Sequence, residues 1–191
     1  MDRQIEINKY IEFIKRWEGG LASGKSDSAS KYPCPTPYNG KTGWHTNCGV
    51  TYGAWVHLFG ITHDDRFYAM NAEDWFKVFK GSFWDKIHGD DFKSFSIAAV
   101  VSEVAWMSGV ERAGKILQKS INNCGLTVVV DGSIGNKTIS NANVIEPAKL
   151  FDAIQTERER FFKAIGVGKN EKYLKGWLNR LNDGTKTFRP H

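Results

Sequence analysis

The chain has 191 residues, of which 41% are hydrophobic and 25% charged, with a formal net charge of +5 and an isoelectric point near 9.0. This length suits one compact unit with a sizeable core, and the composition is that of a globular protein rather than a disordered or fibrous one. The positive charge favours polyanions such as nucleic acid, anionic lipid or an acidic bacterial cell wall, and by itself it does not choose among them. Basic residues alternate with acidic ones and form no long run, which argues against a dedicated nucleic-acid binder.

The first residues, Met1 to Glu6, lack the apolar core of a secretory signal, and no stretch has the length of a membrane span. We therefore expect synthesis in the cytoplasm without a recognisable signal peptide. Three cysteines cannot all pair within one chain, which suggests a reducing site of synthesis. A bridge between Cys34 and Cys48 remains open.

An amphipathic helix is predicted at the start of the chain. Its apolar residues recur at a spacing of three and four: Ile7, Tyr10, Ile11, Phe13, Ile14 and Trp17. The pattern stops at Glu18, and we expect Gly19 or Gly20 to close the helix in the left-handed conformation.

Glu18 lies at the carbonyl-rich end of this helix, which carries partial negative charge, and Trp17 adds apolar surface beside it. Both features disfavour the ionised carboxyl, so we expect it to hold its proton near neutral pH, as a general acid must. The alternative is a solvated residue of the last helical turn.

Residues 21–50 are predicted to be irregular. Pro33, Pro35 and Pro37 exclude a helix there, and a long irregular segment in a small domain is usually functional or disordered. The aromatic residues and the pair Asn39-Gly40 favour an ordered loop or a short hairpin.

The rest of the chain is predicted to be helical. Asn71 is a candidate N-cap, Asp91 is expected to open a central buried helix that Gly109 closes, and Pro147 lies near the start of a long helix. The expected helices cover residues 51–58, 71–84, 92–108, 110–122, a short stretch from 136, 147–165 and 170–182, followed by a loose tail over 185–191. The predicted class is mainly α, with a small irregular or β-hairpin insert after the first helix.

Glycosidic hydrolysis needs an acid and usually a second carboxylate. Between Glu18 and His63 the sequence offers one other carboxylate, Asp27. Such a pair at a helix end and on an adjoining loop would suit a cleft.

Several motifs, in their shared order, resemble the glycoside hydrolase family 108 muramidases, also called secretion activator proteins. The first is Glu18-Gly19-Gly20, followed by Asp27 and by Thr46-Asn47-Cys48-Gly49-Val50-Thr51. Later stretches resemble the family's middle section and its predicted peptidoglycan-binding region: 83–87, 108–109, 116–118, 130–138 and 176–180. The resemblance covers residues 5 to 182.

The resemblance implies a lysozyme-like helical fold, with a catalytic region over 1–109 and a helical peptidoglycan-binding region over 110–191, packed as one compact unit. It implies cleavage of the β-1,4 bond between N-acetylmuramic acid and N-acetylglucosamine, with Glu18 as the acid. Asp27, or a water held by Thr46 or Thr51, would engage the anomeric carbon.

An insertion separates Asp27 from Thr46 relative to the family pattern, which makes a second acid worth seeking elsewhere. Glu103, on the expected central helix, is the reserve candidate, and a buried structural carboxylate is its alternative reading.

Candidate sugar contacts lie in the irregular segment. Trp44, Tyr32 and Tyr38 could stack on saccharide rings or pin the loop to the body, and His45 could contact sugar or hydrogen-bond within the loop. Cysteine and histidine spacing matches no zinc motif, so we expect no metal and no cofactor.

We therefore expect a monomeric peptidoglycan hydrolase whose partners are glycan strands, not nucleic acid or a membrane span. It would reach the cell wall or periplasm through a holin or a dedicated export route. The alternative is a non-catalytic wall-binding or export-accessory protein.

Overall fold

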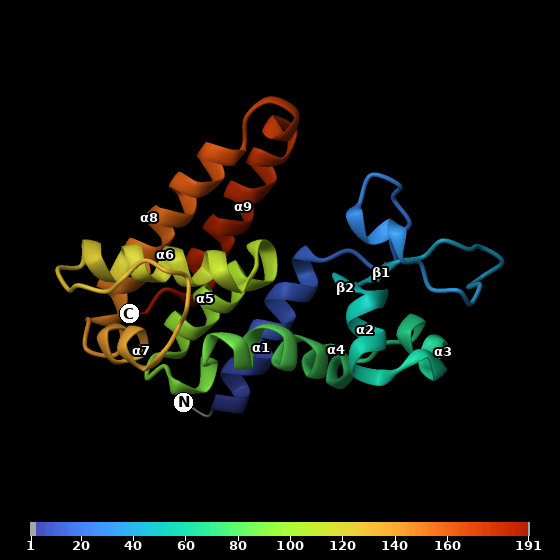
Figure 1. Ribbon diagram of the computed structural model, residues 1–191, viewed down its shortest axis with the longest axis horizontal. Helices are drawn as coiled ribbons and strands as arrows, with labels where there is room; N and C mark the ends of the chain where they lie inside the picture. Colours follow the sequence, from blue (N-terminus) through green and yellow to red (C-terminus); the bar gives the residue numbers. More distant parts are fainter. Residues whose placement is uncertain (1–2, 191) are drawn as a thin grey trace. The chain divides into compact units, whose positions relative to one another are not determined.

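The computed structural model describes residues 3–190, and the chain divides into two compact units, one ending at Ser82 and the other beginning at Phe83. Figure 1 shows the elements coloured from blue at the N-terminus to red at the C-terminus. Unit 1 contains α1 (Arg3–Trp17), β1 (Thr46–Asn47), β2 (Val50–Thr51), α2 (Tyr52–Phe59), α3 (Asp64–Tyr68) and α4 (Ala72–Phe79). Unit 2 contains α5 (Phe95–Ser108), α6 (Val110–Asn123), α7 (Asn136–Ala142), α8 (Pro147–Ile165) and α9 (Glu171–Phe188).

The apolar face of α1 forms the core of unit 1, as its periodicity predicts. Tyr10, Phe13 and Ile14 are almost fully buried. The ring of Tyr10 lies 5.3 Å from that of Phe79 on α4, and Phe79 in turn stacks on Trp75 at 5.2 Å. Aromatic packing therefore fixes the helix whose end carries Glu18.

Helix α1 ends at Trp17 as predicted, but the expected left-handed glycine is wrong. Neither Gly19 nor Gly20 is among the glycines with positive φ. The chain continues outward instead, and the backbone N–H of Ala22 donates to the carbonyl of Thr46 at 2.8 Å. Because the chain runs on to pair with β1 and does not reverse, no left-handed residue is needed.

A two-residue hairpin joins β1 to β2. Thr46 pairs with Thr51 and Asn47 with Val50, and the turn residues Cys48 and Gly49 have φ values of 47° and 77°. Positive φ at both turn positions identifies the type I′ turn that suits the twist of paired strands. The side-chain amide of Asn47 donates to the carbonyl of Phe67 at 2.8 Å, which ties the hairpin to α3.

The rest of the irregular segment is ordered, as predicted. Tyr38 and Lys41 exchange backbone hydrogen bonds around Asn39-Gly40, which is the expected short hairpin. The carboxylate of Asp64 accepts hydrogen bonds from Tyr52 at 2.7 Å and from Thr36 at 2.6 Å. The Asp64 network links the segment to α2 and α3, and the stacking of Tyr38 on Tyr68 adds an aromatic contact.

In unit 2 the central helix is α5, whose residues are buried from Phe95 to Ala105 except Ser96, and which packs against α6, α8 and α9. The central buried helix is thus confirmed. Its predicted start at Asp91 is wrong, since Asp91 ends a separate short turn and Ser94 precedes the helix. His88, with φ of 56°, breaks the helical path before that turn.

The last two helices begin at Pro147 and Glu171, within one residue of the predicted starts, but α9 continues to Phe188, beyond the predicted end at residue 182. The loose tail is therefore wrong over residues 185–188, and Arg189 pairs with Asp152 at 2.7 Å. His191 lies outside the described residues.

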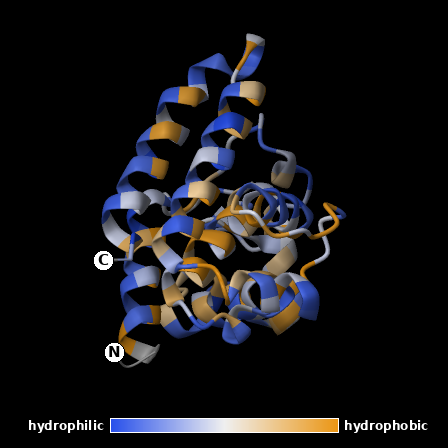
Figure 2. Ribbon diagram, turned by 90° about the vertical axis from the view of Figure 1, so that its left-hand side faces the viewer, coloured by the Kyte–Doolittle hydropathy of each residue, from blue (hydrophilic) through white to orange (hydrophobic). Residues whose placement is uncertain are grey.

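Orange and blue bands along the helices in Figure 2 reflect their alternating apolar and polar faces.

The predicted class, mainly α with a hairpin insert after the first helix, is confirmed. Within residues 3–190, none of the helices combines the length and the apolar character that a bilayer span requires.

Candidate active site

Glu18 directly follows the last residue of α1, and its backbone N–H still donates to the carbonyl of Ile14 at 2.9 Å. Its side chain is half-buried. The neighbouring Gly20 carbonyl accepts the backbone N–H of Cys48 at 3.3 Å, so the strand leaving Glu18 lies along the hairpin turn.

Electrostatics place Glu18 close to that turn as well. Burial raises the pKa of the Cys48 thiol, Lys15 opposes the rise and the Glu18 carboxylate adds to it. The carbonyl of Cys48 accepts a hydrogen bond from Trp75 at 2.9 Å, which anchors the turn to α4. The Glu18 carboxylate and the Lys15 ammonium group are thus near enough to the hairpin turn to influence the Cys48 thiol electrostatically.

The hairpin brings Thr46 and Thr51 directly opposite each other. The hydroxyl of Thr46 is hydrogen-bonded to a ring nitrogen of His45 at 2.9 Å. The hydroxyl of Thr51 is exposed and caps α2 by accepting the backbone N–H of Ala54 at 3.2 Å. A hydroxyl that accepts one such bond still has its proton and a lone pair for a water or a sugar.

An open groove of about 420 Å³ lies beside Thr51. Tyr32, which is 72% exposed, lines it together with Thr51 and with Ser28 and Lys31 from the short 3₁₀ turn of residues 28–31. The fold therefore brings together two of the predicted site residues that are far apart in sequence. The exposed tyrosine ring is available to stack on the apolar face of a sugar.

Asp27 stabilises the short 3₁₀ turn that follows it in the chain. It is the N-cap of the 3₁₀ turn, and its carboxylate accepts the backbone N–H of Ala29 at 2.9 Å. Its side chain is exposed, next to residues that line the groove. A role for Asp27 in catalysis stays a prediction.

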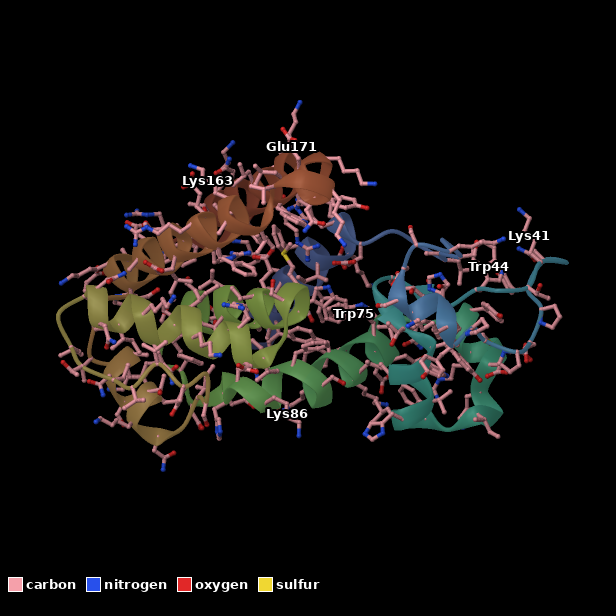
Figure 3. All side chains as sticks on the ribbon, turned by 45° about the horizontal axis from the view of Figure 1, so that its top comes forward. Lys41, Trp44, Trp75, Lys86, Lys163 and Glu171 are labelled. Carbon is pink, nitrogen blue, oxygen red and sulfur yellow. The ribbon has the colours of Figure 1, made fainter. Side chains whose placement is uncertain are left out.

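The other predicted sugar contacts support the loop. His45 is 1% exposed, and its second ring nitrogen is hydrogen-bonded to the carbonyl of Gly24 at 3.2 Å. Tyr38 stacks on Tyr68 with ring centroids 4.5 Å apart. Trp44, labelled in Figure 3, lies half-buried within the irregular segment, where its carbonyl accepts the backbone N–H of Cys34 at 2.7 Å. These contacts favour the loop-supporting alternative for His45 and Tyr38.

Glu103, the reserve candidate for a second acid, is 2% exposed in unit 2. It is held by Arg158 at 2.9 Å and by Arg180 at 3.0 Å. This geometry fits the structural alternative, because two guanidinium groups occupy its oxygens.

Sequence reasoning missed Lys15 and Cys48 near Glu18, and it missed the hydrogen bond from Trp75 that anchors the hairpin turn. The two residues Cys48-Gly49, which lie between Thr46-Asn47 and Val50-Thr51, indicate a tight turn. No feature of the sequence indicates that the side chain of Trp75 hydrogen-bonds to this turn. The three cysteines are free thiols, and no cluster of three or more metal-binding side chains occurs in residues 3–190.

Comparison with known proteins adds two family matches. Residues 11–109 match the model described as Glycosyl hydrolase 108, and residues 112–182 match the model described as Predicted Peptidoglycan domain. No curated protein matches the chain. Among solved structures, that of SagA from Brucella abortus is similar to this chain. The TM-score is 0.71, the sequence identity is 21%, and the alignment covers 98% of each chain.

The structural similarity, at this low identity, concerns the fold and confirms the predicted lysozyme-like helical architecture. The family matches support a glycoside hydrolase that acts on peptidoglycan. The first match covers Glu18, the irregular segment, the hairpin and α5, which is more than half of the chain. The chain therefore belongs to the glycosyl hydrolase 108 family.

Proposed function

We propose that the protein is a muramidase that cleaves the β-1,4 bond between N-acetylmuramic acid and N-acetylglucosamine, with Glu18 as the general acid. Glu18 would protonate the departing O4 of the glycan. The observation that carries the proposal is the position of Glu18, half-buried at the end of α1 and alongside the hairpin, within the part of the chain that matches the hydrolase family.

The groove beside Thr51 would bind the sugar chain. Tyr32 offers an exposed ring there, and Thr51 offers a hydroxyl whose proton is not committed to the cap of α2. Thr51 is the better candidate of the two threonines for holding the attacking water, because the Thr46 hydroxyl is already bonded to His45. Asp27 directly precedes Ser28 of the groove lining and would serve as the second carboxylate.

Replacement of Glu18 by Gln tests the proposal. The amide keeps the shape of the side chain but cannot donate the proton, so release of reducing ends from purified peptidoglycan should fall by about 10²- to 10⁴-fold. Binding to the same peptidoglycan, measured by co-sedimentation, should be retained.

The matched control is Glu12→Gln, which removes the same charge from an exposed position of α1. It should leave both hydrolysis and binding unchanged. Equal hydrolysis by the wild-type protein and the Glu18→Gln variant would refute the assignment of Glu18 as the acid.

A non-catalytic wall-binding or export-accessory protein is the second candidate. The capping role of Asp27 favours it, since a carboxylate bound to the backbone of its own turn is less available as a second catalytic group. A folded wild-type protein that sediments with peptidoglycan but releases no reducing ends between about pH 4 and pH 8 would establish this function instead.

Both functions place the protein at the cell wall. Delivery by a holin or by a dedicated export route would bring it there, and cell fractionation with and without the co-expressed export partner would distinguish the routes.

A further inference from the structure

Unit 2 contains a second groove, formed within the unit by α6 and α8. Its volume is about 330 Å³. Four cations and one carboxylate line it, together with an aromatic ring: Arg112, Lys115, Lys119, Arg160, Glu157 and Phe161. None of these residues belongs to the catalytic proposal.

The cations of α6 form a row. Arg112, Lys115 and Lys119 lie three and four residues apart, which places them on one face of the helix. At a rise of 1.5 Å per residue the row is about 10 Å long. A ligand with several negative groups along a chain matches this row better than a single small anion does.

Two of these cations are not neutralised. Lys115 pairs with Glu111 at 2.5 Å, and Arg160 pairs with Glu157 at 2.5 Å. Arg112 and Lys119 are exposed and form no ion pair among residues 3–190. The Arg112 guanidinium lies 4.7 Å from the centre of the Phe161 ring, which orients its planar donors.

The mixed charge of the lining indicates the kind of ligand. The side chain of Glu157 is 11% exposed, and its Oε1 already accepts hydrogen bonds from Arg160 and Asn123. Its negative charge would repel a continuous phosphate backbone, and its Oε2 can accept a hydrogen bond from an amine or amide. The Arg112 guanidinium lies over the ring of Phe161, so these two groups present a cation and an apolar edge side by side in the groove. A peptide with carboxylates and an amino group satisfies both signs of charge.

We propose that this groove binds the carboxylate-bearing peptide stems of peptidoglycan. The inference rests on the proposed function, in which peptidoglycan is the substrate, and it assigns to unit 2 the recognition of the peptide part of the wall. The groove would hold the protein on the wall by contacts that are separate from glycan cleavage.

The test is co-sedimentation of the full chain with two forms of insoluble peptidoglycan, one intact and one stripped of its peptide stems by an amidase. The variant Arg112→Gln/Lys119→Gln removes the two unpaired cations at exposed positions. Its affinity for intact peptidoglycan should fall by about tenfold, as expected for two partly exposed charge contacts. Wild-type affinity should fall by a similar factor when the stems are removed.

The matched control is Lys163→Gln/Lys175→Gln, which changes the net charge equally at exposed positions outside the lining. Lys163 is labelled in Figure 3. This variant should bind intact peptidoglycan within about twofold of the wild type. Circular dichroism establishes whether each variant is folded. If Arg112→Gln/Lys119→Gln is not folded, the single variant Arg112→Lys provides the second test, and its loss of affinity for intact peptidoglycan should be smaller than about tenfold.

Equal loss of binding in both double variants would overturn the proposal in favour of net charge alone. Stronger binding to polyphosphate or to DNA than to stem-bearing peptidoglycan would also overturn it. Reducing-end release in the Glu18→Gln variant is measured separately. If Glu18→Gln does not reduce hydrolysis but the two double variants still differ in binding, only the catalytic proposal fails. If Glu18→Gln abolishes hydrolysis but the two double variants bind equally, only the groove assignment fails.

Discussion

The segment from residue 18 to residue 51 and the helices of unit 2 are stabilised by different interactions. The segment is largely exposed, and backbone hydrogen bonds to β1 and polar contacts such as those of Asp64 hold it in place. In unit 2 the apolar helix α5 is surrounded by α6, α8 and α9, with one charged cluster buried among them.

This difference explains where the candidate site lies. Hydroxyls, carboxylates and an aromatic ring remain available on the irregular segment because its stability does not require their burial. In unit 2 the apolar side chains of α5 are committed to packing and Glu103 is paired with two arginines, so binding is left to surface grooves such as the one between α6 and α8. Substitutions should therefore reduce stability in unit 2 and activity in the segment.

The largest expected effect on stability comes from Glu103→Gln. It would leave Arg158 and Arg180 buried beside a neutral side chain, and breaking a buried ion pair costs about 3–5 kcal/mol. Urea unfolding followed by circular dichroism measures the loss. Hydrolysis per folded molecule should be unchanged, and a variant that stays stable but loses hydrolysis would return Glu103 to the list of catalytic candidates. The control Glu159→Gln, at an exposed pair with Lys163, should cost less than about 1 kcal/mol.

The glycines provide a second contrast. A Cβ at Gly114 on α6 would lie 2.0 Å from the backbone oxygen of Gly132, whereas a Cβ at Gly20 would meet nothing within 4 Å. Gly114→Ala should therefore cost about 1–3 kcal/mol or more, and Gly20→Ala should change stability by less than about 1 kcal/mol. Thermal unfolding measures both. A reduced hydrolysis rate in a stable Gly20→Ala variant would indicate close passage of the glycan, and equal stability losses in the two variants would contradict the contrast.

Thr51 tests whether one residue serves both the fold and the reaction. Thr51→Ser keeps the cap and the hydroxyl, whereas Thr51→Val loses both and should cost about 1 kcal/mol. If the hydroxyl holds a water in the groove, kcat should also fall in the valine variant at a temperature where both variants are folded. Equal kcat values in the two variants would exclude that role and leave Thr51 as a cap.

The smallest effect is expected from pH. The Arg189 guanidinium lowers the pKa of Asp152, and the backbone N–H groups of Ala148 and Lys149 lower the pKa of Glu146, both in unit 2. A carboxyl whose pKa is lower in the folded state contributes stability above its ordinary pKa, and this contribution is lost as the pH falls through the folded-state value. The unfolding temperature should therefore be level above about pH 5 and fall below about pH 4.

The double variant Glu146→Gln/Asp152→Asn should reduce this acid sensitivity, and Glu159→Gln serves as the control at an exposed position of α8. Thermal scans from about pH 3 to pH 7 provide the measurement. An unchanged slope in the double variant would show that other groups govern the acid response.

The sequence by itself determined the helices and several of their ends. Apolar periodicity located α1, and the apolar character of residues 92–108 around most of the helix located α5. Asn71 and Pro147 marked helix starts because a cap and a fixed φ act on their own neighbours. The motif order around Glu18 also indicated the family, because catalytic chemistry constrains residue types locally.

Only the tertiary structure decided which residues share a site. The pairing of Ala22 with Thr46 replaced the expected left-handed glycine, the groove joined Tyr32 to Thr51, and His45 turned inward to the loop. The row of cations on α6 became one side of a groove only when α8 packed beside it. These outcomes depend on contacts between residues far apart in the chain, and local propensity and periodicity carry no information about such contacts.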